Sequence, residues 1–313
     1  MLTIITTTIN SPTTATKKFA ELSQINNWNF VVVGDTKTPH NEYRDLEKKY
    51  SKVKYLDPED QVALYPDLSE VIGWKTIQRR NIGFVYAYNE LQSEIIATID
   101  DDNIPYDDWG QNILVGKEVE ADVFENNVTG YFDPFSPTNQ NNYWHRGYPV
   151  ECLPTKNIIK HTGVKKVNVK VQADFWNGDP DVDAICRLTN LPLVKFNNFD
   201  TFTTEQPAPF NSQNTFLSRD VFPHYSVWPG VGRMDDIWAS YYLRKYFNEN
   251  IVYCKPSVYQ ERNPQDLVKN LENECIGYRH TKTFIDNKYS LDQNFIPDKT
   301  KKFIEIYEGQ FII

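Results

Sequence analysis

The sequence has few cysteines and no long apolar run. Its 313 residues include four cysteines, which lie far apart and form no C-x-x-C pair, so a disulfide-stapled fold and a structural zinc site are not expected. The N-terminus carries no basic stretch before its short apolar run. No later run reaches the roughly 20 apolar residues of a membrane-spanning helix. We therefore expect a cytoplasmic protein with free thiols and no transmembrane segment.

Basic residues are fewer than acidic ones. Lys and Arg number 33 against 42 Asp and Glu, which gives a formal net charge of −9. Such a surface repels polyanions, so no nucleic-acid partner is expected, whereas a small phosphorylated ligand needs only a few local cations. A glycine-rich phosphate loop is also missing after the first predicted strand, which argues against a nucleotidyltransferase of that type.

The sequence does contain an alternation of strand and helix patterns. Helical patterns at residues 13–24 and 75–91 lie between apolar runs rich in Ile, Val and Thr. These runs predict four strands, at residues 2–9, 29–34, 53–56 and 94–99. The alternation predicts a Rossmann-like α/β fold with a mostly parallel central sheet, in which ligands bind beyond the carboxyl ends of the strands.

The second half of the chain is less regular. Residues 126–210 are rich in proline and predict a loop-rich elaboration over the sheet, in which residues 179–183 form a polar turn before a helix. Further elements are predicted downstream, namely strands at 215–217 and 251–253 and helices at 235–245 and 264–275.

Three adjacent carboxylates follow the strand at 94–99, namely Asp100, Asp101 and Asp102. Adjacent carboxylates repel one another, and a divalent cation is the usual reason to hold them together. Alternation at the strand end predicts Asp100 and Asp102 on one side and Asp101 on the other. A solvated acidic turn is the simpler explanation. The buried-type strand before the triplet favours binding of Mg²⁺ or Mn²⁺ and a nucleotide.

Three other residues are candidates for nucleotide binding. Arg79 and Arg80 lie in the early turns of the 75–91 pattern, where guanidinium groups and a helix N-terminus both favour phosphate oxygens. An exposed basic helix face is the alternative for both. Asp35 follows the strand at 29–34, where an acid can accept hydrogen bonds from a ribose or a base, although a turn Asp needs no ligand.

The run from Ile72 to Asn103 resembles a stretch of the reversibly glycosylated polypeptides, which are plant UDP-arabinopyranose mutases, and of the STELLO-type glycosyltransferases. In this run Arg80, Gly83 and the Thr98–Asp102 motif match the mutase pattern. Three further islands are similar in the same order, at residues 146–149, 232–239 and 258–264. The resemblance extends over roughly residues 75–265.

This resemblance implies a GT-A fold, a nucleoside-diphosphate sugar, in the first place a UDP-sugar, and Mn²⁺ or Mg²⁺. It implies that Asp102 and Asp100 hold the metal and that Asp100 also serves the ribose. The candidates for binding the nucleotide sugar are then Asp35, Arg79, Arg80, Asp100 and Asp101. The chain would form two halves of one domain, residues 1–125 for the nucleotide sugar and residues 126–313 for the acceptor and catalysis.

The resemblance also implies a catalytic role for Arg146, because the arginine at this position carries the reversible sugar in the mutases. A second arginine seven residues later in that family is Leu153 here, and Gln260 stands where the mutases have a His. Both departures weaken the mutase interpretation and make the STELLO-type pattern the closer one. If the metal needs a third protein ligand, His224 and His280 are the candidates.

Asp235 and Asp236 begin the helix pattern at 235–245. Capping explains them without a ligand, but one of them could activate an acceptor hydroxyl as a general base, and Asp236 is the stronger candidate. The expected function is a metal-dependent glycosyltransferase with a glycan or another acceptor. The alternatives are a UDP-sugar pyranose-furanose mutase or self-glycosylating protein, with Arg146 essential, and a non-catalytic protein that binds nucleotide sugars or glycans. A homo-oligomer is compatible with the sequence.

Overall fold

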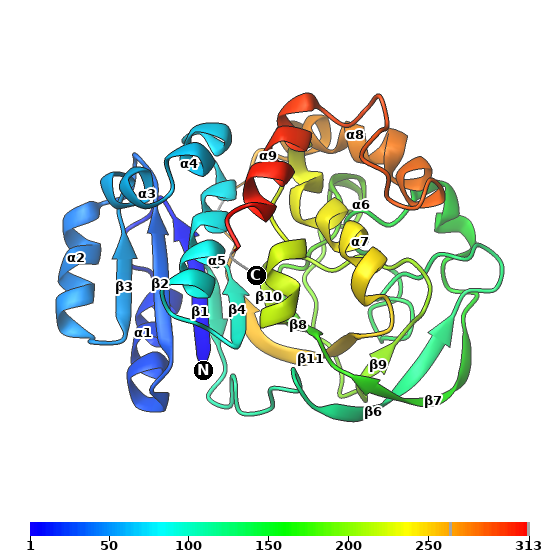
Figure 1. Ribbon diagram of the computed structural model, residues 1–313. Coiled ribbons are helices and arrows are strands. Elements are labelled where there is room, and N and C mark those ends of the chain that lie inside the picture. Colours follow the sequence, from blue (N-terminus) through cyan, green and yellow to red (C-terminus); the bar gives the residue numbers. More distant parts are fainter. Residues whose placement is uncertain (263–264, 312–313) are drawn as a thin grey trace.

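The computed structural model describes residues 1–262 and 265–311 and contains a sheet of eleven strands flanked by helices (Figure 1). The strands lie in the order β3-β2-β1-β4-β10-β8-β11-β9-β6-β7, and β5 pairs with β11 outside this path. The first half of the chain contains β1 (Leu2–Thr8), α1 (Thr14–Asn26), β2 (Asn29–Gly34), α2 (His40–Lys49), β3 (Val53–Leu56), α3 (Pro58–Leu64), α4 (Pro66–Ile72), the 3₁₀ helix η1 (Ile77–Arg79), α5 (Arg80–Asn89) and β4 (Ile95–Ile99).

The four predicted strands of this half are confirmed, and so is the helix at 13–24. Thr13 starts that helix because its side chain accepts a hydrogen bond from the Thr16 amide. The predicted helix at 75–91 begins later, at Arg80, after η1. Helices α2, α3 and α4 were not predicted. Asp57 caps α3 and Pro58 occupies its first turn, so a local start signal was present.

The second half holds more regular structure than its prolines suggest. It contains β5 (Asn103–Pro105), β6 (Glu118–Glu125), η2 (Val150–Thr155), β7 (Lys160–Asn168), β8 (Val171–Gly178), α6 (Ala184–Asn190), β9 (Phe202–Thr203), β10 (Asn214–Ser218), η3 (Arg219–His224), η4 (Gly232–Met234), α7 (Asp235–Phe247), β11 (Ile251–Gln260), α8 (Leu267–Asp286) and α9 (Asp298–Glu308).

The prediction that residues 126–210 are mainly loops was therefore wrong for β7 and β8, whereas the helix predicted after residues 179–183 is confirmed as α6. Strand β8 was not predicted because Gln172 and Asp174 interrupt the run of apolar residues in its sequence. The strand predicted at 251–253 extends through Gln260. The helix predicted at 264–275 runs from Leu267 to Asp286, and its expected start at Pro264 lies outside the described residues.

The direction of the strands decides where a ligand can bind. Strands β3, β2, β1 and β4 are parallel, which confirms an α/β fold compatible with a Rossmann-like arrangement. Strand β10 is antiparallel to both β4 and β8, and β11 is parallel to β8. Because β4 and β8 are both antiparallel to β10, they run in the same direction. The strands β1, β2, β4, β8 and β11 therefore all end at one edge of the sheet. Ligands of open α/β sheets bind at this edge.

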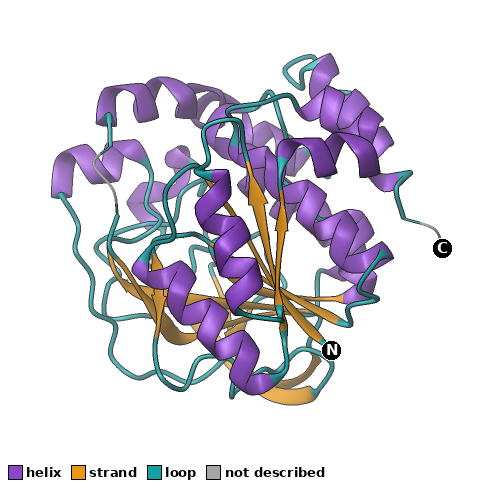
Figure 2. Cartoon of the chain, turned by 90° about the vertical axis from the view of Figure 1, so that its left-hand side faces the viewer, coloured by secondary structure: helices purple, strands orange, loops and turns teal. Residues whose placement is uncertain are grey.

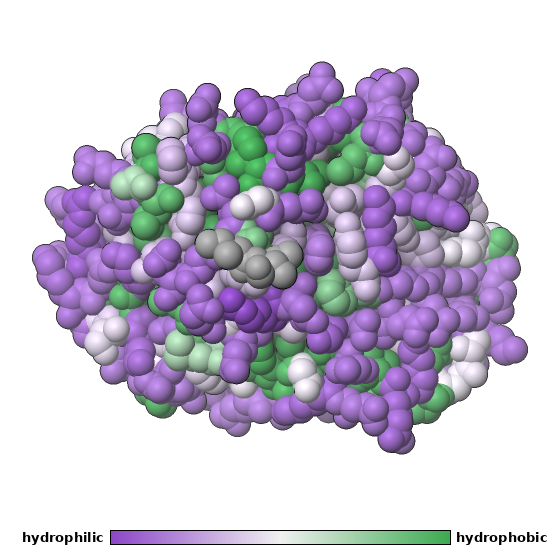
Figure 3. Space-filling view, in the orientation of Figure 1, coloured by the Kyte–Doolittle hydropathy of each residue, from purple (hydrophilic) through white to green (hydrophobic). Residues whose placement is uncertain are grey.

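Helices pack on both faces of the sheet (Figure 2). Helices α1 and α2 contribute to one apolar core with alternate residues of the strands. Helices α4, α5, α7, α8 and α9 contribute to the larger core on the opposite face. The surface in Figure 3 is mostly hydrophilic, with apolar residues in small patches. None of the helices within residues 1–262 and 265–311 combines the length and the apolar character needed to cross a membrane.

Candidate functional site

Two cavities open where the parallel strands end. The larger, which we call the cleft, has a volume of about 370 Å³. The smaller, the side pocket, has a volume of about 270 Å³. Ile77 lines both, so the two cavities adjoin. The charged residues that line the cleft are Asp100, Asp102, Arg146, Arg233, Asp235, Asp236 and Arg262. The side pocket is lined by short polar residues, two carboxylates and two lysines, namely Thr7, Thr8, Asn10, Thr76, Asp35, Asp101, Lys37 and Lys75, together with Ile9 and Ile77.

The aspartate triplet divides between these cavities. Asp100 and Asp102 line the cleft and Asp101 lines the side pocket, so the predicted alternation at the end of β4 is confirmed. Asp101 accepts hydrogen bonds from the Thr8 hydroxyl and, at 3.0 Å, from the Asn10 amide. Burial raises its pKa. One strand end therefore supplies carboxylates to two neighbouring spaces.

The carboxylate of Asp100 is fixed by hydrogen bonds from Arg80 and Gln213. Arg80 donates to Asp100 Oδ1, and Gln213 Nε2 donates to Asp100 Oδ2 at 2.5 Å. Arg80 is fully buried, and its Nη1 donates to the carbonyl and hydroxyl oxygens of Ser212 at 2.7 and 2.8 Å. Arg80 lines neither cavity. It orients a carboxylate of the cleft instead of facing a ligand.

Asp102 lies opposite the end of β11. Its Oδ1 accepts a hydrogen bond from Gln260 Nε2 at 3.1 Å. Burial and the neighbouring negative charge of Asp100 raise the pKa of Asp102 to about 7. Two carboxylates that face one cavity and repel each other form a region that favours a cation.

The donor atoms near this pair suit Mg²⁺ or Mn²⁺. Gln213 Oε1 is buried without a hydrogen-bond partner in the described part of the chain, so it adds an unused oxygen beside Asp100. No cluster of three or more His, Cys, Asp or Glu side chains within residues 1–262 and 265–311 has metal-binding geometry. A hard cation that takes one or two carboxylates and completes its shell with phosphate and water needs no such cluster.

Neither histidine proposed as a third ligand faces the cleft. His224 stacks on Tyr246 with ring centroids 4.1 Å apart, and His280 stacks on Phe295 at 4.4 Å. Both residues are absent from the lining of the cleft. The prediction of a histidine ligand from these two positions is therefore not supported by the arrangement of the described residues.

Arg146 lines the cleft and lies between two carboxylates. Its Nε and Nη2 donate to the two oxygens of Asp181 at 2.7 and 3.0 Å, and its Nη1 donates to Asp236 at 3.0 Å. Nη1 also donates to the carbonyl oxygen of Arg233. The charges of Asp181 and Asp236 outweigh burial and raise the pKa of Arg146 well above its ordinary value. Arg146 is therefore a rigid positive charge in the wall of the cleft.

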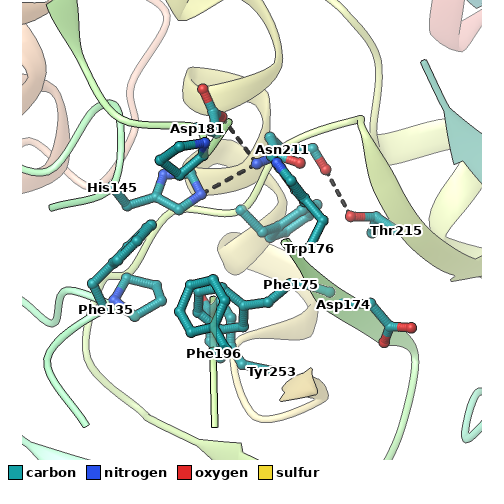
Figure 4. Close-up of a pocket in the computed structure, with 14 residues that line it drawn as sticks. Phe135, His145, Asp174, Phe175, Trp176, Asp181, Phe196, Asn211, Thr215 and Tyr253 are labelled. Carbon is teal, nitrogen blue, oxygen red and sulfur yellow. Dashed lines mark hydrogen bonds between the residues drawn. The ribbon is translucent and has the colours of Figure 1, made fainter. Parts of the chain in front are cut away.

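Asp181 lies in the polar segment between β8 and α6 that was predicted as a turn before a helix, and it has a role that the prediction did not include. It is 3% exposed, and the Arg146 charge outweighs burial and lowers the pKa of Asp181. Asn211 Nδ2 donates to Asp181 Oδ2 at 2.9 Å and lies 3.3 Å from His145 Nε2 (Figure 4). The hydrogen bond from Asn211 therefore fixes the Asp181 carboxylate that binds Arg146.

Behind this group lies a small aromatic void. Figure 4 shows the rings of Phe135, Phe175, Phe196 and Tyr253 around it, with His145 next to Phe135. Its volume of about 30 Å³ holds a water molecule but no sugar. The void therefore belongs to the support of the cleft and is not a substrate site.

Asp235 and Asp236 differ in the number of hydrogen bonds that they accept. Asp236 Oδ2 accepts hydrogen bonds from the amide and the hydroxyl of Ser212 at 2.9 and 3.0 Å, and Oδ1 accepts from Arg146. Asp235 Oδ2 accepts from Gln78 Nε2 at 2.7 Å, and its Oδ1 accepts from the Asp236 amide at 3.0 Å. Burial and the charge of Asp236 raise the pKa of Asp235 to about 7. Asp235 is therefore better suited than Asp236 to take up a proton, which reverses the order expected from the sequence.

Two predicted nucleotide ligands have different surroundings. Asp35 lines the side pocket, and amide hydrogen bonds from Lys75, Thr76 and Thr36 outweigh burial and lower its pKa. Arg79 is fully buried and lines neither cavity. Its guanidinium donates to Gln61 and Ser69 and lies 3.8 Å from the ring of Trp74. The structure therefore does not bring Arg79 to the candidate site.

Sequence reasoning missed several residues of the cleft, namely Gln78, Ser212, Gln213, Arg233 and Arg262. Ser212 and Gln213 precede β10, and because β10 runs antiparallel its start lies at the ligand-binding edge. A polar run before the predicted strand at 215–217 was the available signal. The sequence did not reveal the direction of that strand.

No family model matches this sequence, and no curated protein sequence matches it.

Proposed function

We propose that this protein is a metal-dependent glycosyltransferase of GT-A type that uses a UDP-sugar. The observation that supports this most is the division of the Asp100–Asp102 triplet between two adjoining cavities. The cleft combines carboxylates with arginines, and the side pocket combines threonines and Asn10 with two carboxylates and with Lys37 and Lys75. A nucleotide sugar also has two parts, a diphosphate with its sugar and a nucleoside whose base and ribose form hydrogen bonds.

In this proposal the nucleoside occupies the side pocket. Asp35, Asn10 and the threonines at the end of β1 offer hydrogen-bonding groups to a base and a ribose. Ile77 lines both cavities and so marks the place where they adjoin. The diphosphate of the same ligand would extend past Ile77 into the cleft. Arg233 and Arg262, which line the cleft, supply positive charge for phosphate oxygens.

Asp102 and Asp100 would hold the divalent cation, with the Gln213 amide oxygen beside them. When bound, such a cation stabilises the negative charge that develops on the leaving diphosphate. The chain itself orients these ligands, since Arg80 fixes Asp100 and Gln260 fixes Asp102. These contacts set the cation-binding carboxylates before a donor arrives.

Asp235 would be the general base for transfer to an acceptor hydroxyl. Its carboxylate faces the cleft, where Gln78 donates to one of its oxygens and the Asp236 amide to the other. With its pKa raised to about 7, it is ionised in part near neutral pH and can accept the acceptor's proton. Arg146 remains bound to Asp181 and Asp236 and stabilises negative charge in the same wall.

The mutase alternative has less support. A sugar carried by Arg146 requires a nitrogen that is free to attack. In the structure Nε, Nη1 and Nη2 all donate to carboxylate or carbonyl oxygens. The sequence also argues against a mutase, because Leu153 stands where that family has its second arginine.

Thermal-shift and product-release assays test the proposal. In the first assay, the unfolding midpoint of the wild-type protein is measured with UDP, GDP or ADP, with and without Mn²⁺. In the second, release of the nucleoside diphosphate from the corresponding nucleotide sugars is measured. We expect UDP with Mn²⁺ to raise the unfolding midpoint most, and Asp102→Asn to remove both the shift and the release. The matched control is Asp107→Asn, an exposed aspartate outside both cavities. Full metal-dependent release by Asp102→Asn would contradict the proposal.

A further inference from the structure

A third cavity lies on the face of the sheet that carries Phe216 and Cys254, which is the face covered by α1 and α2, and it shares no residue with the cleft or the side pocket. We call it the β8–β11 pocket. Its volume of about 390 Å³ is similar to that of the cleft and falls in the range of small-molecule sites, roughly 300–1,000 Å³. Its walls come from β8, β11 and the loops around residues 108–114 and 198–201. Neither the transfer reaction nor its donor uses this space.

The pocket exists because β11 bulges. The ladder between β8 and β11 shifts register between Cys254 and Val258, and the three intervening residues include Pro256. Proline cannot donate a ladder hydrogen bond, so it is confined to edges and bulges. Bulges are frequent beside functional sites because they redirect side chains. Here the bulge separates Lys255 and Ser257 from the neighbouring strand and leaves a cavity beside Asp174.

Asp174 is a buried carboxylate of this pocket, and Gln172 beside it is also buried. Asp174 is 8% exposed, and Gln172 Nε2 donates to its Oδ1 at 2.8 Å. Figure 4 shows it pointing away from the aromatic void, as alternation along β8 requires for a neighbour of Phe175. Burial raises its pKa to about 7, and hydrogen bonds from Ser257 and Gln172 offset this only in part. A ligand that donates hydrogen bonds would stabilise such a carboxylate.

The rim of the pocket carries more acceptors and one aromatic ring. Asp108, Asn198 and Asp200 are exposed and line the opening, and the half-buried ring of Phe199 lies among them. The carboxylates do not gather into a metal cluster within the described ranges of the chain. Acceptors spread around a cavity suit a ligand whose donors are also spread, and an aromatic ring suits the apolar face of a sugar.

We propose that the β8–β11 pocket binds a sugar unit of a neutral glycan, with its hydroxyls donating to Asp174 and Asp200 and its ring lying against Phe199. Amide groups such as that of Asn198 donate to sugar oxygens as well as accept from hydroxyls, so both hydrogen-bonding roles are met. This inference does not depend on the glycosyltransferase proposal, because the two sites have no residue in common.

Saturation-transfer NMR on the full chain tests the inference without nucleotide or metal. The probes are the methyl glycosides of glucose, galactose, mannose, xylose and arabinose, together with maltose, cellobiose and lactose, at millimolar concentration. We expect at least one probe to bind wild-type protein. Asp200→Ala and Asn198→Ala should each weaken binding, by about tenfold for the charged partner. Both residues are exposed, so their replacement spares the fold.

Two further variants locate the binding. Asp174→Asn keeps the shape of the buried side chain and should weaken binding by a similar factor. Asp102→Asn alters only the cleft and should leave saccharide binding unchanged. The inference is overturned if no probe binds, if the rim variants bind like the wild type, or if Asp102→Asn abolishes binding.

Discussion

Arg146 and Asp181 are joined at two levels. Their side chains form two parallel hydrogen bonds of 2.7 and 3.0 Å, and the Arg146 amide donates to the Asp181 carbonyl oxygen at 3.0 Å. The two residues are 35 positions apart in the sequence, and each is at most 5% exposed. This contact ties the loop before η2 to the loop after β8, and so builds one wall of the cleft.

Breaking this pair should destabilise the fold. Asp181→Ala leaves the Arg146 charge buried with one carboxylate partner fewer, and removal of one partner of a buried pair typically costs about 3–5 kcal/mol. Denaturant unfolding measures this free energy. Asp107→Ala, at an exposed position, should change it by less than about 0.5 kcal/mol. Equal stability of the two variants would show that the pair adds nothing to the fold.

Arg79 and Arg80 provide a test of positioning. Both are fully buried, but only Arg80 donates to Asp100, whereas Arg79 donates to Gln61 and Ser69. Arg80→Lys should therefore weaken Mn²⁺ binding by about 10–100-fold, the usual effect of losing a residue that orients a ligand. Arg79→Lys should lower the unfolding midpoint and leave Mn²⁺ affinity unchanged. Calorimetric titration with Mn²⁺ distinguishes them, and equal losses of affinity would refute the assignment.

Asp235 should control the pH dependence of transfer. Its raised pKa of about 7, caused by burial and by Asp236, means that the carboxylate gains its proton as pH falls through 7. Because the base must be ionised, turnover should rise with pH through this range. Asp235→Asn should lower kcat by about 10²–10⁴-fold and keep donor affinity. Asp236 carries the structural contacts, so Asp236→Asn should lower the unfolding midpoint. An unchanged pH profile in Asp235→Asn would exclude Asp235 as the base.

Gly178 connects the end of β8 to the ligands of the cleft. It has a φ of +95°, and a Cβ at this position would lie 2.4 Å from the Gln260 carbonyl oxygen. Gly178→Ala should displace Gln260, which donates to Asp102, and so weaken Mn²⁺ binding. Gly116→Ala is the control, because Gly116 has a φ of +83° and no atom within 4 Å of the added Cβ. Both substitutions should cost stability, but only the first should change the Mn²⁺ titration.

Much of the N-terminal half could be predicted because its strands carry their own signal. Strand β2 is a continuous apolar run that is buried on both faces, and β4 ends in three carboxylates. Helix α2 was missed because only Tyr43 and Leu46 of its residues are buried, which leaves a weak apolar pattern. Strand β8 was missed because Gln172 and Asp174 face a polar pocket instead of a core.

The sequence by itself determined the α/β alternation, the position of the acidic triplet and its division between two sides of the strand. These follow from local periodicity, since alternation along a strand acts within a few residues. Only the tertiary structure decided that Arg80 positions Asp100 while Arg79 lies elsewhere, that Asp181 pairs with Arg146, and that Asp235 is the less constrained acid. Those contacts join residues up to 157 positions apart, as in Gln78 and Asp235, and strand order and direction, which no local pattern encodes, bring them together.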